Sequence, residues 1–197
     1  MQFLILSGNP KRDGLCHSVM EAVAEGAQAG GAQVEIFAPV RIERCRMCGD
    51  GWGPCKEKHV CAFGDGDGFH EGQAMVAHAD AICLISPVYW HEISEGLKCF
   101  LDKLRRCESG PAGALAGKPV LLIASPGGTG NGMLSALEQM DRFCRHTHAK
   151  IFDYIGINRW NQDYKRQAAY RAAMAIAEGR CPGETYIGQE GDLPHRS

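Results

Sequence analysis

Five short apolar segments recur along the chain, and stretches with helical periodicity alternate with them. The expected strands cover residues 2–6, 33–37, 81–85, 119–124 and 150–157, and the expected helices cover about 15–29, 94–106, 133–146 and 162–178. Continuous apolar strands of this length are typical of a parallel sheet that is buried on both faces. Because parallel strands need helical crossovers, the alternation predicts an α/β fold with a doubly wound sheet.

The length and composition of the chain fit one globular domain. Its 197 residues are 45% apolar and 22% charged, which excludes wholesale disorder. We expect this domain over residues 1–179, with a Gly- and Cys-rich insertion at 41–70 and a loose C-terminal tail at 180–197.

The charge and the apolar runs exclude two classes of partner. A formal net charge of −2 gives no electrostatic footprint for nucleic acid or an anionic membrane. The apolar N-terminal run is too short for a signal peptide, and no run approaches the length of a membrane span. We therefore expect a cytoplasmic protein that binds neither nucleic acid nor membrane.

Three polar or Gly-rich turns follow expected strands, at residues 7–16, 86–91 and 125–132. In a doubly wound sheet such turns meet at the carboxyl edge, where ligands bind. The first turn carries Lys11 and Arg12 beside a helix N-terminus, an arrangement that suits a phosphate group. It lacks both the dinucleotide Gly-x-Gly-x-x-Gly spacing and the Walker Gly-Lys-Ser/Thr, so a solvated turn is the alternative interpretation.

The other two turns suit a planar ligand. Tyr89 and Trp90 can present flat side chains to a ring, although packing as a lid on the core is the alternative. The turn at 125–132 holds four glycines, which allow a close approach of backbone to ligand.

The motifs at these turns resemble one known family. The pattern Gly-Asn-Pro-Lys-Arg-x-Gly at 8–14, the Ser-Pro-Val-Tyr-Trp at 86–90 and the Leu-Lys-x-Phe-Leu-Asp-Lys-Leu at 97–104 resemble the NADPH-dependent FMN reductase and iron–sulfur flavoprotein group of the flavodoxin-like superfamily. The resemblance extends to about residue 179. It implies a flavodoxin-like five-stranded sheet of order 2-1-3-4-5, with the Cys-rich insertion between strands two and three.

The resemblance also implies an FMN site. The first turn would hold the phosphate, and the other two would border the ribityl chain and the isoalloxazine ring. Asn9, Lys11, Leu15 and Cys16 stand where the family commonly has Ser, Arg, Asn and Thr, so Lys11, Arg12, backbone N–H groups and Ser18 would substitute. The implied FMN-binding residues are Asn9, Pro10, Lys11, Arg12, Gly14, Leu15, Cys16, Ser18, Pro87, Val88, Tyr89, Trp90, Ser125, Pro126, Gly127, Gly128, Thr129 and Gly130.

Four of the ten cysteines, Cys45, Cys48, Cys55 and Cys61, crowd into the insertion. Three interpretations stay open: a [4Fe–4S] cluster, unligated or redox-active thiols, and a structural zinc. Resemblance to iron–sulfur flavoproteins implies the cluster, although their middle spacing has two residues where this chain has six. The other six cysteines are scattered, and we expect most of them to be small buried hydrophobes or tail residues; they are Cys16, Cys83, Cys99, Cys107, Cys144 and Cys181.

Some polar residues near the insertion are given other roles. His59 and His70 are alternative metal ligands, although loop histidines are more often solvated. Asp65 and Asp67 lack the bidentate Glu of a calcium loop. The resemblance places an acidic pair before a helix here, which implies a helix cap or turn role for them. Asp102 and Lys103 are expected on a solvated helix face rather than in a catalytic pair.

The predicted function is that of an FMN-dependent NAD(P)H oxidoreductase. In the first of the three interpretations of the clustered cysteines, a [4Fe–4S] cluster exchanges electrons with the flavin. Tyr89, Trp90 and His91 are the candidate catalytic residues, shaping the substrate side of the flavin. The acceptor would be a small molecule or a protein, and the resemblance implies a homodimer or homotetramer. The alternatives are a non-enzymatic flavodoxin-like electron carrier and a zinc-binding structural or regulatory protein.

Overall fold

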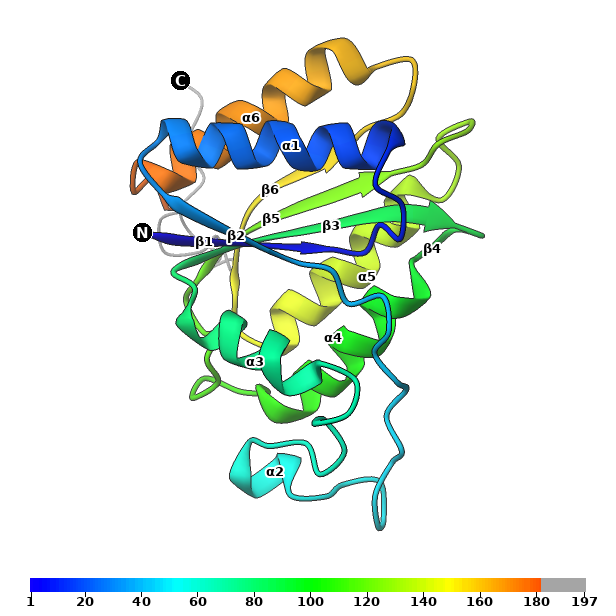
Figure 1. Ribbon diagram of the computed structural model, residues 1–197, viewed down its shortest axis with the longest axis vertical. Helices are drawn as coiled ribbons and strands as arrows, with labels where there is room; N and C mark the ends of the chain where they lie inside the picture. The colour runs from blue at the N-terminus through cyan, green and yellow to red at the C-terminus, as the bar shows by residue number, and fades with distance from the viewer. Residues whose placement is uncertain (182–197) are drawn as a thin grey trace, which may run out of the picture.

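The computed structural model describes residues 1–181 and contains one mixed sheet (Figure 1). Its strands are β1 (Gln2–Ser7), β2 (Gln33–Phe37), β3 (Ala81–Tyr89), β4 (Glu92–Ile93), β5 (Pro119–Ser125) and β6 (Lys150–Gly156). Five of them are parallel and lie in the order β2-β1-β3-β5-β6, while the two-residue β4 pairs antiparallel with β3. Counting only the parallel strands, the order is 2-1-3-4-5, which confirms the predicted fold.

Helices cover both faces of this sheet (Figure 1). One face carries α1 (Gly14–Ala29) and α6 (Gln162–Ala177), and the other carries α3 (Phe69–His78), α4 (Glu95–Cys107) and α5 (Met133–His146). The one-turn α2 (Cys55–Lys58) lies in the insertion, beyond α3 and α4 and away from the sheet. Within the described residues, no helix is long and apolar enough to cross a membrane.

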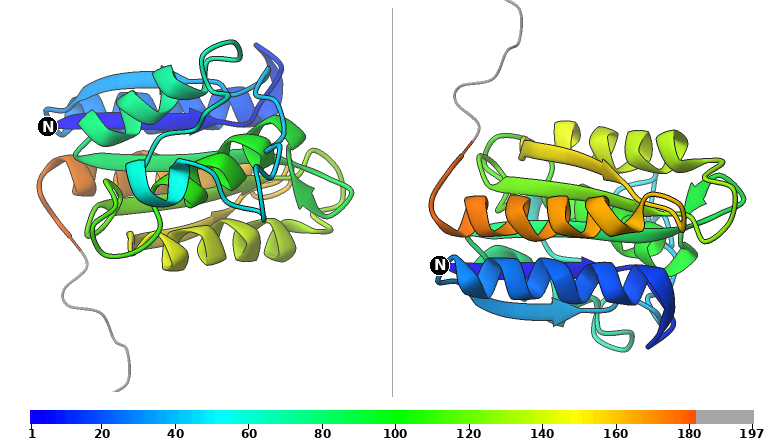
Figure 2. Two further views of the ribbon diagram at one scale, coloured as in Figure 1. Left: turned by 90° about the horizontal axis from the view of Figure 1, so that it is seen from below. Right: turned by 90° about the horizontal axis from the view of Figure 1, so that it is seen from above.

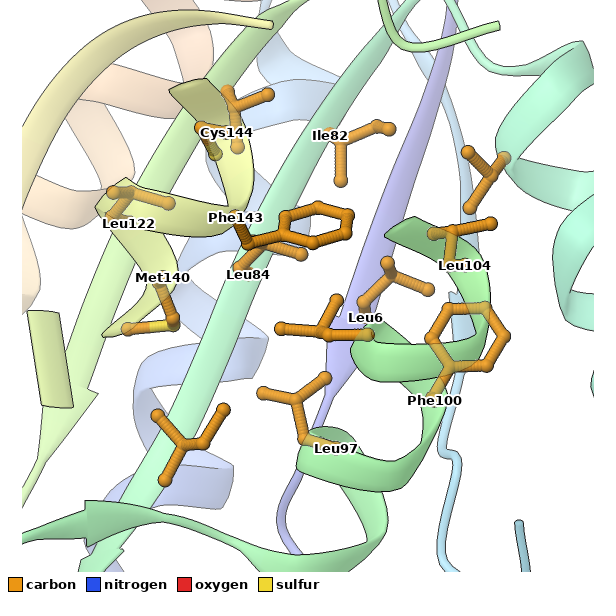
Figure 3. Close-up of a cluster of buried hydrophobic side chains, with 14 of the residues drawn as sticks. Leu6, Ile82, Leu84, Leu97, Phe100, Leu104, Leu122, Met140, Phe143 and Cys144 are labelled. Atoms are coloured by element: carbon orange, nitrogen blue, oxygen red, sulfur yellow. The ribbon is translucent and has the colours of Figure 1, made fainter. Parts of the chain in front are cut away.

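Alternating side chains of the buried strands supply two separate cores. In β1, Phe3 and Ile5 point toward α1 and α6, whereas Leu4 and Leu6 point toward α3, α4 and α5. Figure 3 shows the second core, where Leu6 and Leu84 of the strands meet side chains of α4 and α5. Burial on both faces explains why these strands read as unbroken apolar runs.

The helices α1 and α6 lie side by side across one face of the sheet (Figure 2). At their contact, a Cβ on Gly26 would collide with the carbonyl oxygen of Tyr170. Gly26 therefore permits the close approach of the two backbones. This close contact explains the presence of a glycine inside a helix, where it lowers stability by its backbone entropy.

The end of β3 differs from the prediction. We expected Ser86 and Pro87 to close this strand, but it continues to Tyr89 and returns through β4 as a short hairpin. Proline is tolerated here because the β1–β3 pairing has ended at Ile85, so the missing N–H breaks no bond to β1.

The insertion is more ordered than its composition indicates. Residues 41–70 contain α2 and the first two residues of α3. Helix α2 was not predicted, and α3 was implied only as the helix that follows the acidic pair. Six helices and strands were predicted after the insertion. Five of them match observed elements to within a few residues, and the sixth, β3, is longer than predicted. Of the expected tail, only Arg180 and Cys181 belong to the described residues, so this prediction otherwise lies outside them.

Candidate functional site

The three predicted turns meet at the carboxyl edge of the sheet, on the right of Figure 1. They follow β1, β3 and β5, which are neighbours in the sheet. The Gly8 N–H donates to the carbonyl oxygen of Ile85 at 2.8 Å, which ties the first turn to the central strand. This edge is also the topological switch point, because the chain passes from β1 to β2 on one side and from β3 to β5 on the other.

The first turn is shaped by the side chain of Asn9. Its Oδ1 accepts from the Lys11 N–H at 3.2 Å, and its Nδ2 donates to the Lys11 carbonyl at 2.8 Å. The side chains of Lys11 and Arg12 are exposed, and no side chain caps the N-terminus of α1. First-turn N–H groups and two cations are thus free to meet an anion, as a phosphate cradle requires.

Two predicted ligands of this turn have side chains that face elsewhere. Cys16 is 7% exposed and packs in the core under α1, and burial raises the pKa of its thiol to about 12. The Ser18 hydroxyl donates to the carbonyl of Leu15 at 2.9 Å, inside the helix. Any contribution of Cys16 to phosphate binding therefore falls to its backbone N–H.

The hairpin between β3 and β4 has a strained tip. Trp90 and His91 both have positive φ, at 50° and 69°, a backbone conformation that bulky residues rarely adopt. The Trp90 side chain is 96% exposed, and His91 lies against Gly132 of the turn after β5. Burial raises the pKa of Tyr89 further above neutral, where a phenol is already protonated. Strain of this kind is found at functional sites.

Buried serine hydroxyls lie along the same edge, at the ends of β1, β3 and β5 and just before α4. Ser86 is fully bonded: its Oγ accepts from the Ser94 N–H at 2.9 Å and donates to the Pro87 carbonyl at 2.8 Å. Ser125 is 3% exposed, and its hydroxyl has no partner. A buried, unpartnered hydroxyl at a ligand-binding edge is an available hydrogen-bonding group for a ligand.

A fourth segment at this edge was missed by the sequence analysis. Asn158, just after β6, contacts Gly130, where a Cβ would lie 2.9 Å from its Nδ2. Its Oδ1 accepts from the N–H groups of Trp160 and Asn161, and Asn161 Oδ1 accepts in turn from the Asn158 N–H at 2.8 Å. Two asparagines three residues apart between a strand and a helix are the signal that could have revealed this turn.

The four insertion cysteines line one cavity, together with a fifth thiol that the sequence analysis assigned to packing. This fifth thiol is Cys107 of α4, which is 1% exposed. All ten cysteines are free thiols. We call this space the cysteine cavity; its thiols are Cys45, Cys48, Cys55, Cys61 and Cys107.

Cations from α4 and from the insertion also line the cysteine cavity, namely Arg44, Arg46, Lys103 and Arg106. Arg106 donates to the Gly51 carbonyl and lies over the Trp52 ring at 5.0 Å. Lys103 is not on a solvated face, so that prediction was wrong: its side chain is 2% exposed and pairs with Asp67 at 2.5 Å. Asp102 is half exposed and pairs with Lys98.

Asp67 ties the end of the insertion to α3 and α4. Its carboxylate accepts from the Phe69 N–H at 3.0 Å, which confirms the turn that was one of its two predicted roles, while the N-cap of α3 is Gly68. The carboxylate also accepts from the Glu43 N–H at 2.9 Å. Burial alone would raise its pKa, but the hydrogen bonds from Lys103, Phe69 and Glu43 outweigh burial and lower it.

The two histidines near the cavity hold the backbone. His59 Nδ1 lies 2.5 Å from the Cys107 carbonyl, and His70 Nε2 lies 2.8 Å from the Cys61 carbonyl. His70 Nδ1 also contacts Asp65 at 2.6 Å. Three of their four ring nitrogens are thus engaged in shaping the insertion.

The thiols surround the cavity without converging on one point. Among residues 1–181, no three side chains of His, Cys, Asp or Glu are placed to hold a single metal ion. A tetrahedral zinc would need such convergence. An iron–sulfur cluster spreads its thiolates because each binds a different iron, so thiols on the walls of one cavity, with cations beside them, suit a cluster as a donor set.

Comparisons with known proteins agree with this geometry. A family model described as NADPH-dependent FMN reductase matches residues 1–160. An "Iron-sulfur flavoprotein" of Archaeoglobus fulgidus is 26% identical over 106 residues, which are 53% of this chain and 46% of that protein. The match thus spans less than half of the relative's length.

Solved structures of low sequence identity share the fold. The NAD(P)H:quinone oxidoreductase from Methanothermobacter marburgensis superposes with a TM-score of 0.65 at 17% identity, over 89% of this chain and 96% of that one. An FMN-dependent NADH-azoreductase from Bacillus anthracis superposes with a TM-score of 0.67 at 13% identity, over 91% of this chain and 99% of that one.

Proposed function

The chain belongs to the NADPH-dependent FMN reductase family, and on that premise we propose that it is an FMN-dependent oxidoreductase that uses NAD(P)H. The observation that carries the proposal is the meeting of three groups at one sheet edge. These are an uncapped helix N-terminus with Lys11 and Arg12, an exposed aromatic hairpin and a Gly-rich turn that begins with the unpartnered Ser125 hydroxyl.

The residues at this edge fit FMN in kind. The N–H groups at the start of α1, with Lys11 and Arg12, would hold the phosphate. The turn at 125–130 would face the polar edge of the ring system, since Gly127 and Gly128 have open space where a Cβ would stand. Bound FMN supplies the hydride and electron chemistry, and the protein supplies binding, orientation and access.

Tyr89, Trp90 and His91 remain the candidates for the substrate side. The strained hairpin tip holds these side chains outward, and Trp90 is almost fully exposed. A protonated Tyr89 phenol can donate a hydrogen bond to a substrate. This role for the three residues is a proposal that the hairpin geometry supports.

The finer part of the proposal is a [4Fe–4S] cluster in the cysteine cavity, a cofactor that transfers single electrons. The five thiols and four cations that line the cavity support it, because cations stabilise thiolates and an anionic cluster. The name of the Archaeoglobus fulgidus relative is consistent with such a cofactor.

Partners and compartment follow from the same features. We call the carboxyl edge of the sheet, where the turns after β1, β3 and β5 meet, the flavin edge. Exposed apolar side chains there, including Trp90, Leu134 and Trp160, support contact with an electron acceptor or with a second copy in a homodimer or homotetramer. Ten free thiols support a reducing compartment such as the cytoplasm.

The test is purification without oxygen, followed by FMN titration and assay of NADPH and NADH oxidation with an artificial acceptor. We expect FMN to bind and NAD(P)H oxidation to depend on it. In the double variant Lys11→Ala/Arg12→Ala, loss of two charged phosphate contacts should weaken FMN binding by at least tenfold.

A matched control removes two exposed lysines from the insertion, as Lys56→Ala/Lys58→Ala, and should bind FMN like the parent. Failure of the parent chain to bind FMN would overturn the proposal. FMN binding without NAD(P)H oxidation would instead favour the electron carrier.

A further inference from the structure

Cys107 stands apart from the other thiols of the cysteine cavity because it belongs to the folded scaffold. It is the last residue of α4 and lies in the buried core beside Leu104. Helix α4 buries Leu97, Phe100 and Leu104 against the sheet (Figure 3). Cys107 belongs to the same buried cluster, so its position is fixed by packing. The four other thiols lie on the insertion, where only one turn of helix is present.

Two insertion cysteines are the neighbours of Cys107. Cys55 and Cys61 are partly buried and pack against the same core cluster that contains Cys107. Cys45 lines the same cavity as these three thiols. Cys55 and Cys61 thus share both the core cluster and the cavity with Cys107, and Cys45 shares the cavity.

Cys48 is placed differently. It packs against Gly53, where a Cβ would lie 3.3 Å from the Cys48 Sγ, and its carbonyl accepts from the Gly51 N–H at 3.0 Å. These contacts fold Cys48 into the turn at 49–53, which is the part of the insertion made longer by the six-residue spacing.

We propose that Cys107 is a ligand of the [4Fe–4S] cluster, together with Cys45, Cys55 and Cys61, and that Cys48 lies outside this set. The proposal rests on the cluster named under the proposed function. Ligation forms one Fe–S bond at the Cys107 Sγ, and the thiol proton leaves to solvent. Lys103 and Arg106, on the same helix as Cys107, also line the cavity, where their charges would favour an anionic cluster.

A scaffold ligand has a structural consequence. With three ligands on the insertion and one on α4, the cluster would fasten the insertion to the domain. This adds to the bracing that Lys103 and Arg106 already provide through Asp67 and the Gly51 carbonyl.

The test compares Cys107→Ala with Cys48→Ala in the full chain. Each variant is reconstituted without oxygen from ferrous iron and sulfide, and iron and labile sulfide per chain are measured. The electron paramagnetic resonance of the dithionite-reduced protein is recorded. We expect about four irons per chain in the parent and in Cys48→Ala, and at least a fourfold loss in Cys107→Ala.

Two controls separate ligation from folding. Cys144→Ala removes another buried thiol of the same core, away from the cysteine cavity, and should keep its iron. Circular dichroism and FMN binding report whether each variant is folded. If Cys107→Ala is misfolded, the near-isosteric Cys107→Ser is measured instead. An altered resonance spectrum and a lowered iron content in Cys107→Ser would then support ligation by Cys107.

The outcomes are distinguishable. Full iron content in a folded Cys107 variant, or an equal loss in Cys48→Ala, would overturn the assignment of Cys107 while leaving the cluster in place. No iron in the parent would overturn the cluster itself, and with it the assignment, but not the FMN site.

Discussion

At the scale of single residues, two serine hydroxyls at the ends of neighbouring strands are in opposite situations. Ser86 makes two hydrogen bonds, whereas Ser125 makes none. Leaving a buried hydroxyl without a partner costs about 1–3 kcal/mol. The free energy that Ser125 costs the ligand-free chain is recovered if the hydroxyl bonds a ligand.

We therefore expect Ser125→Ala to leave the ligand-free protein as stable as the parent, or more stable by about 1 kcal/mol, and to weaken FMN binding about tenfold. Urea unfolding and fluorescence titration measure the two effects. Ser86→Ala is the matched control and should destabilise the chain by about 1–3 kcal/mol, because it strands the Ser94 N–H. A loss of stability without loss of affinity in Ser125→Ala would contradict this role.

Individual side chains were also where the sequence was least informative. Lys103 was expected in solvent, but Asp67, 36 residues earlier in the chain, pairs with it in the interior. In the sequence, Cys107 has the pattern of one more apolar position of an amphipathic helix. It lines a cavity only because the insertion folds next to this end of the helix. Periodicity reports which face of a helix is buried, not what is buried against its end.

At the scale of elements, the buried pair of Lys103 and Asp67 joins α4 to the insertion. Asp67→Asn leaves an uncompensated buried ammonium, and we expect it to cost about 3–5 kcal/mol of unfolding free energy at pH 7. The control Asp102→Asn breaks a half-exposed pair with Lys98 on the same helix and should cost less than about 1 kcal/mol.

The pH dependence of this pair has a defined sign. The pKa of Asp67 is lower in the folded protein than in the unfolded chain, so its contribution is present above about pH 4 and is lost as the pH falls through the folded pKa. The difference in stability between the parent and Asp67→Asn should therefore shrink in acid. Urea unfolding at pH 7 and below pH 4 measures it, and a constant difference would show that the carboxylate charge is not responsible.

Most elements of the fold were predictable, because each strand and long helix carries its own periodicity over several residues. The residues of α5 were predicted without error, and those of α1, α4 and α6 to within one residue at either end. The exceptions have local causes. The β3–β4 hairpin turns on Trp90 and His91 instead of the expected Asn or Gly, and α2 and the start of α3 lie among glycines that mask helical periodicity.

At the scale of the whole molecule, the flavin edge and the cysteine cavity lie toward opposite ends of α4. Ser94 precedes the helix beside the first turn, while Lys103, Arg106 and Cys107 in its last turns line the cavity. A helix of 13 residues spans about 20 Å. The two sites are therefore expected to load independently.

We expect a variant with Cys45, Cys48, Cys55 and Cys61 all changed to Ser to bind FMN within about twofold of the parent, because none of these residues touches the flavin edge. Fluorescence titration measures the affinity, and iron analysis confirms the loss of the second site. A large loss of FMN affinity with unchanged circular dichroism would show that the two sites are coupled.

The way the insertion is attached also bears on how such proteins diversify. Of its residues, only Ile42 and Phe69, near its two borders, belong to the large buried side chains of the cores. The part between these two residues is attached by polar contacts, which involve Lys103 and Arg106 of α4 and the two histidines. A lineage could therefore lengthen, shorten or discard the part between Ile42 and Phe69 without rebuilding either core. The metal chemistry proposed for it would then be gained and lost separately from the flavin chemistry that the sheet supports.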